Sequence, residues 1–224
     1  MIPLRDSNRS YHFPIMNWLL IAANALVFFH ELSLSSGQLD RFIGAYALVP
    51  ARVEEAPIAF GITIFSSMFL HAGWFHVLSN MWVLYIFGDN VEDRMGSLPY
   101  LVFYLLCGLA AGLLQTYLTP GSRVPVLGAS GAIAGVLGAY IFLFPRARVV
   151  TLVPIIFFLS IIEVPAILFL GFWFFSQLFS GLASIGAEAA QGVAWWAHIG
   201  GFAVGLVFCS FFLRRPPPRQ VEFS

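Results

Sequence analysis

Charged side chains are scarce in this sequence, and lysine is absent altogether. Asp, Glu, Lys and Arg make up only 10% of the 224 residues, and all eleven basic residues are arginine. A soluble domain carries about 25% charged residues, so this composition excludes an ordinary water-soluble globule. The arginines form no basic stripe, which argues against a nucleic-acid partner.

Cysteine is almost absent as well. Cys107 and Cys209 both lie in apolar runs, where we expect small buried hydrophobic residues and neither a disulfide nor a metal pair. The H-E-x-x-H motif of zinc metalloproteases is missing. His71 and His76 are five residues apart, so on one helix they would point about 140° away from each other. We therefore expect no metal ion and no other cofactor.

Apolar residues dominate what is present. They make up 59% of the chain, and a membrane-spanning helix needs ~20 of them in succession. Such runs predict an all-α, polytopic membrane protein, a bundle of six transmembrane helices. The expected spans are 15–34, 68–87, 98–118, 130–144, 164–183 and 194–213. Residues 149–162 are also apolar but leave no room for a further span, so we expect an interfacial or partly re-entrant segment there.

The distribution of arginine predicts the orientation. With the N-terminus inside, eight arginines fall on the inner side and three on the outer side, in line with the positive-inside rule. We expect a cytoplasmic segment at 1–14, the membrane domain at 15–213 and a cytoplasmic tail at 214–224. No transit peptide is evident, so the expected location is a prokaryotic plasma (inner) membrane. Ala23-Asn24-Ala25 resembles a signal-peptide cleavage site, but the apolar run continues through Phe29, which favours a retained anchor.

Ser130 belongs to the first of three sets of polar groups that stand out in the apolar spans. It lies in Gly128-Ala129-Ser130-Gly131, after a loop and at the start of a short span rich in small residues. At a helix start, backbone N–H groups and the positive end of the helix dipole stabilise a developing oxyanion. The flanking glycines would let a substrate backbone come close. A serine that only packs against a neighbouring helix is the alternative.

His198 forms the second set, at the start of the last span. Gly201 and Gly205 follow it as a G-x-x-x-G face, which permits close contact between two helices. The fourth span offers a matching face of glycines that begins with Gly131. Contact between these faces would bring His198 to Ser130, as a general base requires. An interfacial histidine bonded to water is the alternative.

His76 and Asn80 form the third set. They are spaced i and i+4, so they lie on one face of the second span. Both can donate hydrogen bonds to an oxyanion. Polar contacts that merely join helices are the alternative, because they are common in membranes.

Depth in the membrane links the three sets. Counted from the outer face, His76 lies roughly 12 Å along its span and His198 roughly 6 Å along its own. The fourth span is only about 22 Å long against a hydrocarbon core of ~30 Å, which puts Ser130 roughly 8 Å below the outer surface. All three sets then share one layer, which favours catalysis over packing alone.

The motifs G-A-S-G, A-H-x-G-G and H-x-x-x-N together resemble those of the rhomboid family of intramembrane serine proteases, over nearly the whole chain. The resemblance implies a Ser130–His198 dyad that acts without a third acid. It also implies that His76, Asn80 and the Ser130 backbone N–H hold the oxyanion. One departure concerns Ala134, because some members have a tyrosine there that stacks on the catalytic histidine.

The resemblance also implies a set of structural parts. Residues 35–67 would be a half-embedded first loop, and 181–193 a cap over the site. Glu92 and Arg94 match an acidic–basic pair after the second span. The residues implied to support the site are Gly128, Gly131, Glu92, Arg94, Gly201 and Gly205.

The implied partners are the lipid bilayer and transmembrane protein substrates, cleaved near the outer membrane face. A substrate helix must enter sideways, and the bulky aromatic fifth span has no close-packing motif of small residues. Phe172 and Trp173 on this span are therefore the expected gate, and smaller residues there are expected to raise cleavage. The alternative function is a catalytically inactive, derlin-like membrane scaffold. Such proteins typically lose the serine or the histidine, and this chain keeps both.

Overall fold

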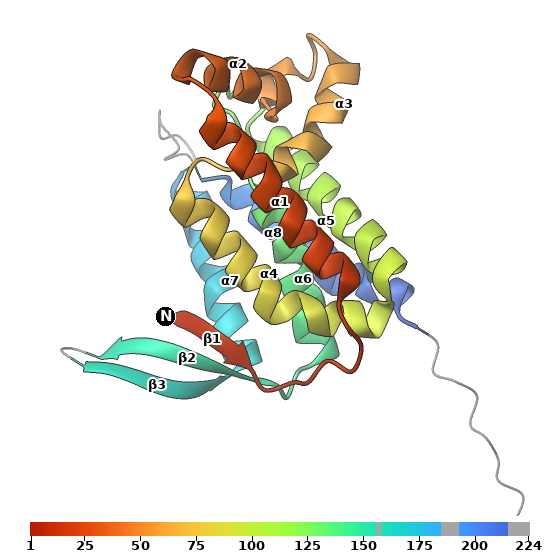
Figure 1. The fold of residues 1–224 in the computed structure, drawn as a ribbon, viewed down its shortest axis with the longest axis vertical. Coiled ribbons are helices and arrows are strands. Elements are labelled where there is room, and N and C mark those ends of the chain that lie inside the picture. Colours follow the sequence, from red (N-terminus) through yellow and green to blue (C-terminus); the bar gives the residue numbers. More distant parts are fainter. Residues whose placement is uncertain (156–157, 185–192, 215–224) are drawn as a thin grey trace, which may run out of the picture.

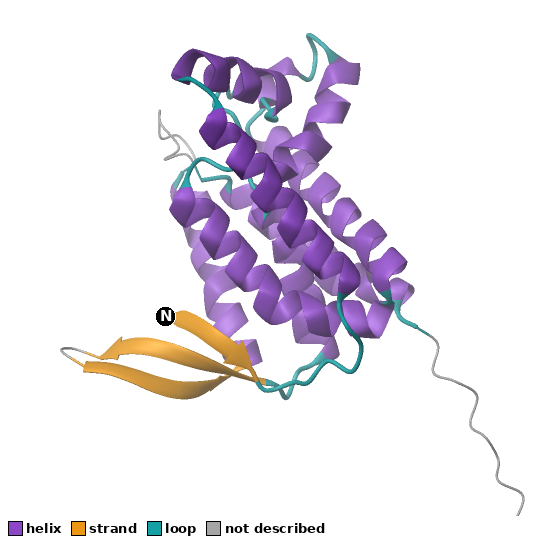
Figure 2. Cartoon of the chain, in the orientation of Figure 1, coloured by secondary structure: helices purple, strands orange, loops and turns teal. Residues whose placement is uncertain are grey.

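Apolar helices run side by side in a bundle, with a small β-sheet at one end (Figures 1 and 2). This computed structural model describes residues 1–155, 158–184 and 193–214. We call the end of the bundle that carries the sheet the sheet end. Both the start of α1 and the end of α8 lie there (Figure 1). The two ends of the described chain thus share one side of the bundle, as an even number of crossings requires.

Eight α-helices lie in the described residues. They are α1 (Ile15–Ser33), α2 (Ser36–Tyr46), α3 (Pro57–Ser66), α4 (Trp74–Met95), α5 (Ser97–Leu118), α6 (Ser130–Leu143), α7 (Ala166–Ala183) and α8 (Trp195–Phe208), with 3-10 turns η1 (Pro50–Arg52), η2 (Ser67–Phe69) and η3 (Cys209–Phe212). The predicted spans correspond to α1 and to α4 through α8.

The predicted polytopic helical bundle is confirmed. Four segments are long and apolar enough to cross a membrane, namely Ile15–Ser33, Ser97–Leu118, Ala166–Ala183 and Trp195–Phe212. Pro57–Phe69 and Trp74–Met95 qualify together as one pair, bent by 82°. The helix α6 is apolar but has only 14 residues, fewer than the ~20 of a full span. The count of six crossings therefore stays a prediction.

The expected first loop is largely helical. A capping box between Ser35 and Gln38 begins α2, since the Gln38 side chain accepts from the Ser35 backbone N–H. Pro57 stands at the first turn of α3, where its missing N–H removes no helical hydrogen bond. The loop thus forms two short helices at the end of the bundle opposite the sheet (Figure 1).

The helix α4 begins later and ends later than the predicted span 68–87. The polar last turns of α4 bind the start of α1. The Glu92 carboxylate accepts the backbone N–H groups of Met16 at 3.0 Å and Asn17 at 2.7 Å. These N–H groups lie in the first turn of α1 and have no acceptor within that helix. Gly96, with φ +87°, then ends α4 and begins α5.

Glu92 and Arg94, which match the acidic–basic pair of the resemblance, form no ion pair with each other. Among the described residues, the ion pairs are His12–Asp93, Arg123–Glu55 and Arg148–Glu163. The Arg94 carbonyl oxygen instead accepts the Arg214 N–H at 3.0 Å, and its guanidinium lies 5.7 Å from the centre of the Phe144 ring. The Glu92 side chain thus holds the start of α1, whereas Arg94 holds Arg214, beyond the end of η3, through its backbone carbonyl.

The all-α prediction missed a three-stranded antiparallel sheet (orange in Figure 2). It has the order β1 (Ile2–Asp6), β2 (Arg148–Ile155), β3 (Phe158–Pro165). The interfacial or re-entrant segment expected at 149–162 is therefore a β-hairpin. The segment is rich in Val and Ile, which favour extended backbone, and β1 supplies a third strand from the other end of the chain. Pro165 ends β3, and α7 begins at the next residue.

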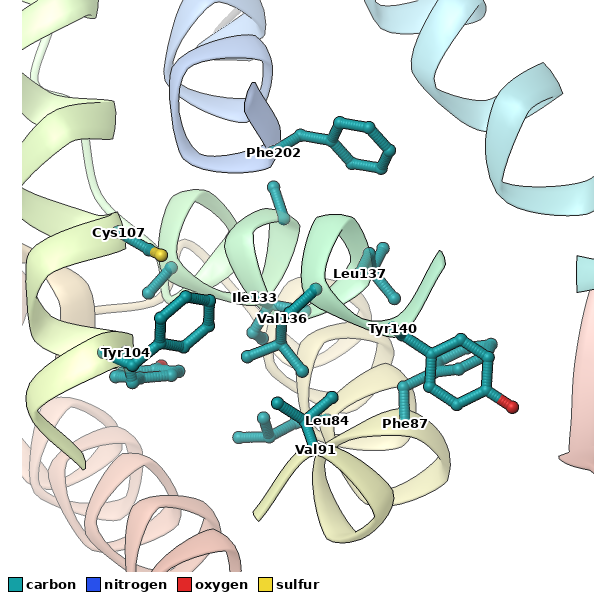
Figure 3. Close-up of a cluster of buried hydrophobic side chains, with 14 of the residues drawn as sticks. Leu84, Phe87, Val91, Tyr104, Cys107, Ile133, Val136, Leu137, Tyr140 and Phe202 are labelled. Carbon is teal, nitrogen blue, oxygen red and sulfur yellow. The ribbon is translucent and has the colours of Figure 1, made fainter. Parts of the chain in front are cut away.

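The helix α6 lies at the centre of the bundle and is buried from Gly131 to Tyr140. Leu84 and Val91 of α4, Tyr104 and Cys107 of α5 and Phe202 of α8 surround it (Figure 3). The glycines of α6 and α8 meet backbone to backbone. A Cβ on Gly201 would overlap the carbonyl oxygen of Gly131, and a Cβ on Gly205 would overlap that of Gly135. The predicted small-residue contact between these helices is thus present.

Candidate active site

Ser130 is the first residue of α6. Gly128, two residues before it, has φ +121°, a conformation that favours glycine, and its N–H donates to the Ser67 carbonyl at 2.9 Å. A Cβ at position 128 would lie only 2.6 Å from His76 Nε2. Glycine therefore lets the chain turn into α6 while His76 stays beside it.

The structure brings Ser130 and His198 together, as the sequence predicted. His198 Nε2 lies 2.7 Å from Ser130 Oγ, across the junction of α6 and α8. The contact between Gly131 and Gly201 fixes the spacing of the two helices next to this pair. The resemblance had left the support of the His198 ring open, because Ala134 cannot stack on it.

Two residues of α7 support the His198 ring. The sequence did not indicate Gln177, and it indicated Trp173 only as a gate residue. Gln177 Oε1 lies 2.7 Å from His198 Nδ1. The Trp173 ring lies over the imidazole, with ring centres 5.8 Å apart and planes inclined by 37°. Trp173 and Gln177 are spaced i and i+4, so they share one face of α7. The signal in the sequence for Gln177 was a single amide in a largely apolar span, one helical turn after a tryptophan.

His76 and Asn80 lie beside the same turn of chain. The Ala72 N–H donates to His76 Nδ1 at 3.4 Å. A neutral His76 ring that accepts this bond at Nδ1 carries its proton on Nε2. Of the atoms around position 128, Nε2 is the one nearest to where a Cβ would lie. Asn80 Nδ2 lies 3.1 Å from Nε2 of the buried His71. His71 thus holds Asn80 in place, a role that the sequence did not suggest.

A cavity of about 530 Å³ joins these groups. Its walls come from α4, α6, α7 and α8, and it extends to Met1 and Pro3 of the N-terminal segment. Its lining is Met1, Pro3, Phe75, His76, Ser79, Asn80, Val83, Phe87, Leu127, Ser130, Ile133, Leu137, Phe169, Leu170, Trp173, Val193, Ala194 and His198. Mostly apolar walls around a few convergent polar groups are typical of a ligand site.

The two predicted gate residues point in different directions. Phe172 is 65% exposed on the outside of α7 and does not line the cavity. Trp173 lines the cavity and covers His198, so a smaller residue there would also remove support from the ring. Most of the expected cap at 181–193 falls outside the described residues.

Within the described ranges, no group of three or more His, Cys, Asp or Glu side chains could hold a metal ion. Cys107 and Cys209 are both buried free thiols. The polar side chains that line the cavity are the hydroxyls of Ser79 and Ser130, the imidazoles of His76 and His198 and the amide of Asn80.

Comparison with known proteins gives one family. The model of the Rhomboid domain matches residues 61–215. Rhomboid protein 1, mitochondrial, of Saccharomyces cerevisiae is 29% identical over 75% of this chain and 45% of its own. Presenilin-associated rhomboid-like protein, mitochondrial, of Mus musculus is 28% identical over 86% of this chain and 47% of its own. Rhomboid-like protein 11, chloroplastic, of Arabidopsis thaliana is 41% identical over 31% of this chain and 25% of its own.

The chain spans about half the length of the mitochondrial relatives it matches. These relatives carry the names of organelles, so they do not support the expected prokaryotic plasma membrane. The apolar helices indicate an integral membrane protein in any compartment.

Proposed function

The chain belongs to the rhomboid family, and we propose that it is a serine-type intramembrane endopeptidase. Ser130 is the proposed nucleophile and His198 the general base. The observation that carries this proposal is the 2.7 Å separation of Ser130 Oγ and His198 Nε2 at the wall of the cavity. This distance is within the range of a nucleophile–base hydrogen bond.

The proposed reaction uses this geometry. His198 takes the proton of Ser130 as Oγ attacks the scissile carbonyl carbon, and a tetrahedral oxyanion forms. The imidazolium then protonates the leaving amine, the C–N bond breaks and an acyl-enzyme remains. Water, deprotonated by His198, cleaves the ester and restores Ser130. One water is consumed, and the products are one amine and one carboxylate.

The oxyanion has three proposed donors. His76 and Asn80 line the cavity near Gly128, and the N–H of Ser130 lies in the first turn of α6, where helical N–H groups have no acceptor within the helix. Removing one such donor typically lowers the rate ~10²–10³-fold. Asn80→Ala should therefore leave measurable cleavage, whereas Ser130→Ala should leave none.

The proposed substrates are transmembrane segments of other membrane proteins. The cavity lies between α4 and α7, and α7 packs mainly against α8. A substrate is proposed to enter between α4 and α7 and to unwind locally, since Ser130 needs an extended carbonyl. We further propose N-in and C-in topology, with cleavage near the outer face.

Entry between these helices can be tested by cross-linking. Cysteines at Val83 and Phe169, which line the cavity from α4 and α7, are joined by a bifunctional maleimide. The native thiols are buried and should not compete. The link should stop cleavage of a transmembrane substrate, while a monofunctional maleimide should not. Equal cleavage with and without the link would contradict entry at this position.

A serine-hydrolase probe separates the protease from an inactive scaffold. A fluorophosphonate should label the wild-type protein at Ser130, and neither Ser130→Ala nor His198→Ala should be labelled. Reconstituted wild-type protein should also cleave a transmembrane substrate in liposomes. An unlabelled, folded wild-type protein that cleaves no such substrate would favour the scaffold.

A further inference from the structure

Gln177 is a buried polar side chain in the apolar helix α7. It is 8% exposed, and a buried amide is costly unless it is hydrogen-bonded. It has two neighbours that meet this need. Its Oε1 lies 2.7 Å from His198 Nδ1, and its Nε2 donates to Ser176 Oγ at 3.1 Å.

The neighbour Ser176 fixes which way the amide points. Ser176 Oγ donates its own proton to the Trp173 carbonyl at 2.6 Å, so the hydroxyl is free to accept from Gln177 Nε2. This leaves Oε1, which can only accept, facing His198. His198 Nδ1 must then carry a proton, and Nε2 keeps the lone pair that accepts the proton of Ser130.

We infer that Gln177 is a positioning residue that holds His198 as a general base. Gln177 and Trp173 both lie on α7, the helix beside the proposed substrate entry. Displacement of α7 would therefore remove the acceptor at Nδ1 and the ring over His198 together. Full reactivity at Ser130 then requires that α7 lie against α8. The inference rests on the proposed function.

Two substitutions separate positioning from packing. Gln177→Met keeps the length of the side chain and removes the acceptor, so kcat for a small soluble peptide ester should fall about 2- to 12-fold, the effect of one neutral hydrogen bond. KM should change little, because Gln177 does not line the cavity.

Gln177→Glu keeps an acceptor and adds a carboxylate. The carboxylate stabilises the imidazolium, so the acid limb of the pH–rate profile should move to higher pH. His76 is the other imidazole that lines the cavity, and it is unchanged in both variants. A side chain that only fills space would not move this limb.

A double-mutant cycle tests the dependence on α7. Phe174 stacks on Phe202 of α8, with ring centres 4.6 Å apart, so Phe174→Ala should loosen α7 and lower kcat for the soluble ester. If part of the loss acts through Gln177, Phe174→Ala should lower kcat by a smaller factor in Gln177→Met than in the wild type, and the remainder is the loss of the Trp173 ring. Effects that multiply would show that the position of α7 does not act through this bond.

The controls keep the two proposals apart. Phe179→Leu changes an exposed residue of α7, so its kcat and pH profile should match those of the wild type. Ser130→Ala gives the background rate without the proposed nucleophile. If the wild type is neither labelled nor active, the protease function itself fails. If the wild type is active, the positioning role is overturned when Gln177→Met retains kcat or when Gln177→Glu retains the wild-type pH profile. Melting temperatures identify a variant that fails to fold, and the other variant then decides.

Discussion

Replacement of Gly201 by alanine tests whether close helix packing holds the site together. The added methyl group would lie 2.9 Å from the Gly131 carbonyl carbon and closer still to its oxygen, whereas ordinary van der Waals contact begins at 3.4 Å. The neighbours are backbone atoms and cannot rotate away, so α6 and α8 must separate locally by about 1 Å. Overpacking of this kind costs ~1–3 kcal/mol of folding stability.

The same displacement should affect the chemistry. Gly131 follows Ser130, and Gly201 lies one turn after His198, so a shift of about 1 Å would lengthen their 2.7 Å contact beyond the ~3.2 Å limit of a working hydrogen bond. A misplacement of this size can lower the rate ~10²-fold. The assay is the rate of fluorophosphonate labelling, together with thermal unfolding in detergent.

The control for this change is Gly171→Ala in α7. Nothing lies within 4 Å of a methyl group there, and alanine in a helix interior is favoured over glycine by roughly 0.5–1 kcal/mol. This variant should unfold at or slightly above the wild-type temperature and be labelled normally. Wild-type stability and labelling in Gly201→Ala would refute the view that backbone contact sets the Ser130–His198 distance.

Three further outcomes are expected. Glu92→Ala should lower the free energy of unfolding by about 0.5–2 kcal/mol, because the start of α1 loses its acceptor, and unfolding in detergent measures this. Gly128→Ala should slow probe labelling and also lower the melting temperature, because the new methyl group must displace His76 and alanine is strained at φ +121°. Burial raises the pKa of Asp6 from 3.8 to about 6, so the folded state binds the proton more tightly than the unfolded state. Stability should therefore fall as pH rises from about 4 to about 6, and Asp6→Asn should flatten that dependence.

The helical bundle and the contact between Ser130 and His198 could be predicted because lipid imposes a simple rule. Apolar runs of ~20 residues that cross the bilayer form helices, and polar groups inside such helices are costly and usually functional. Ser130 and His198 satisfied that rule, and the glycines around them indicated which helices meet. The structure places Ser130 beside His198, while the depth of this pair in the membrane stays a prediction.

The sheet and Gln177 depend on information that a local pattern does not hold. The strand β2 pairs with β1, about 145 residues earlier in the chain, and an apolar run alone does not distinguish a strand from an interfacial segment. Gln177 reaches His198 only because α7 turns that side chain toward α8. The sequence pattern of one helix does not show which of its sides faces a given neighbour. The predicted end of α4 was too early for the same reason. Its polar last turns bind the start of α1, a partner that the local pattern does not show.

The sheet also connects the two helices that lie on either side of the cavity. Trp82 of α4 donates to the Pro3 carbonyl of β1 at 2.7 Å, β1 pairs with the hairpin, and β3 continues directly into α7. The two helices beside the cavity are thus joined through β1 and the hairpin at the sheet end, away from the start of α6. If α7 swings out, this connection is its hinge, and the opening is a wedge that is widest near Ser130 and narrow near Pro3. The turns of a substrate helix that lie at the depth of Ser130 would then enter first, while the rest of that helix is still in lipid.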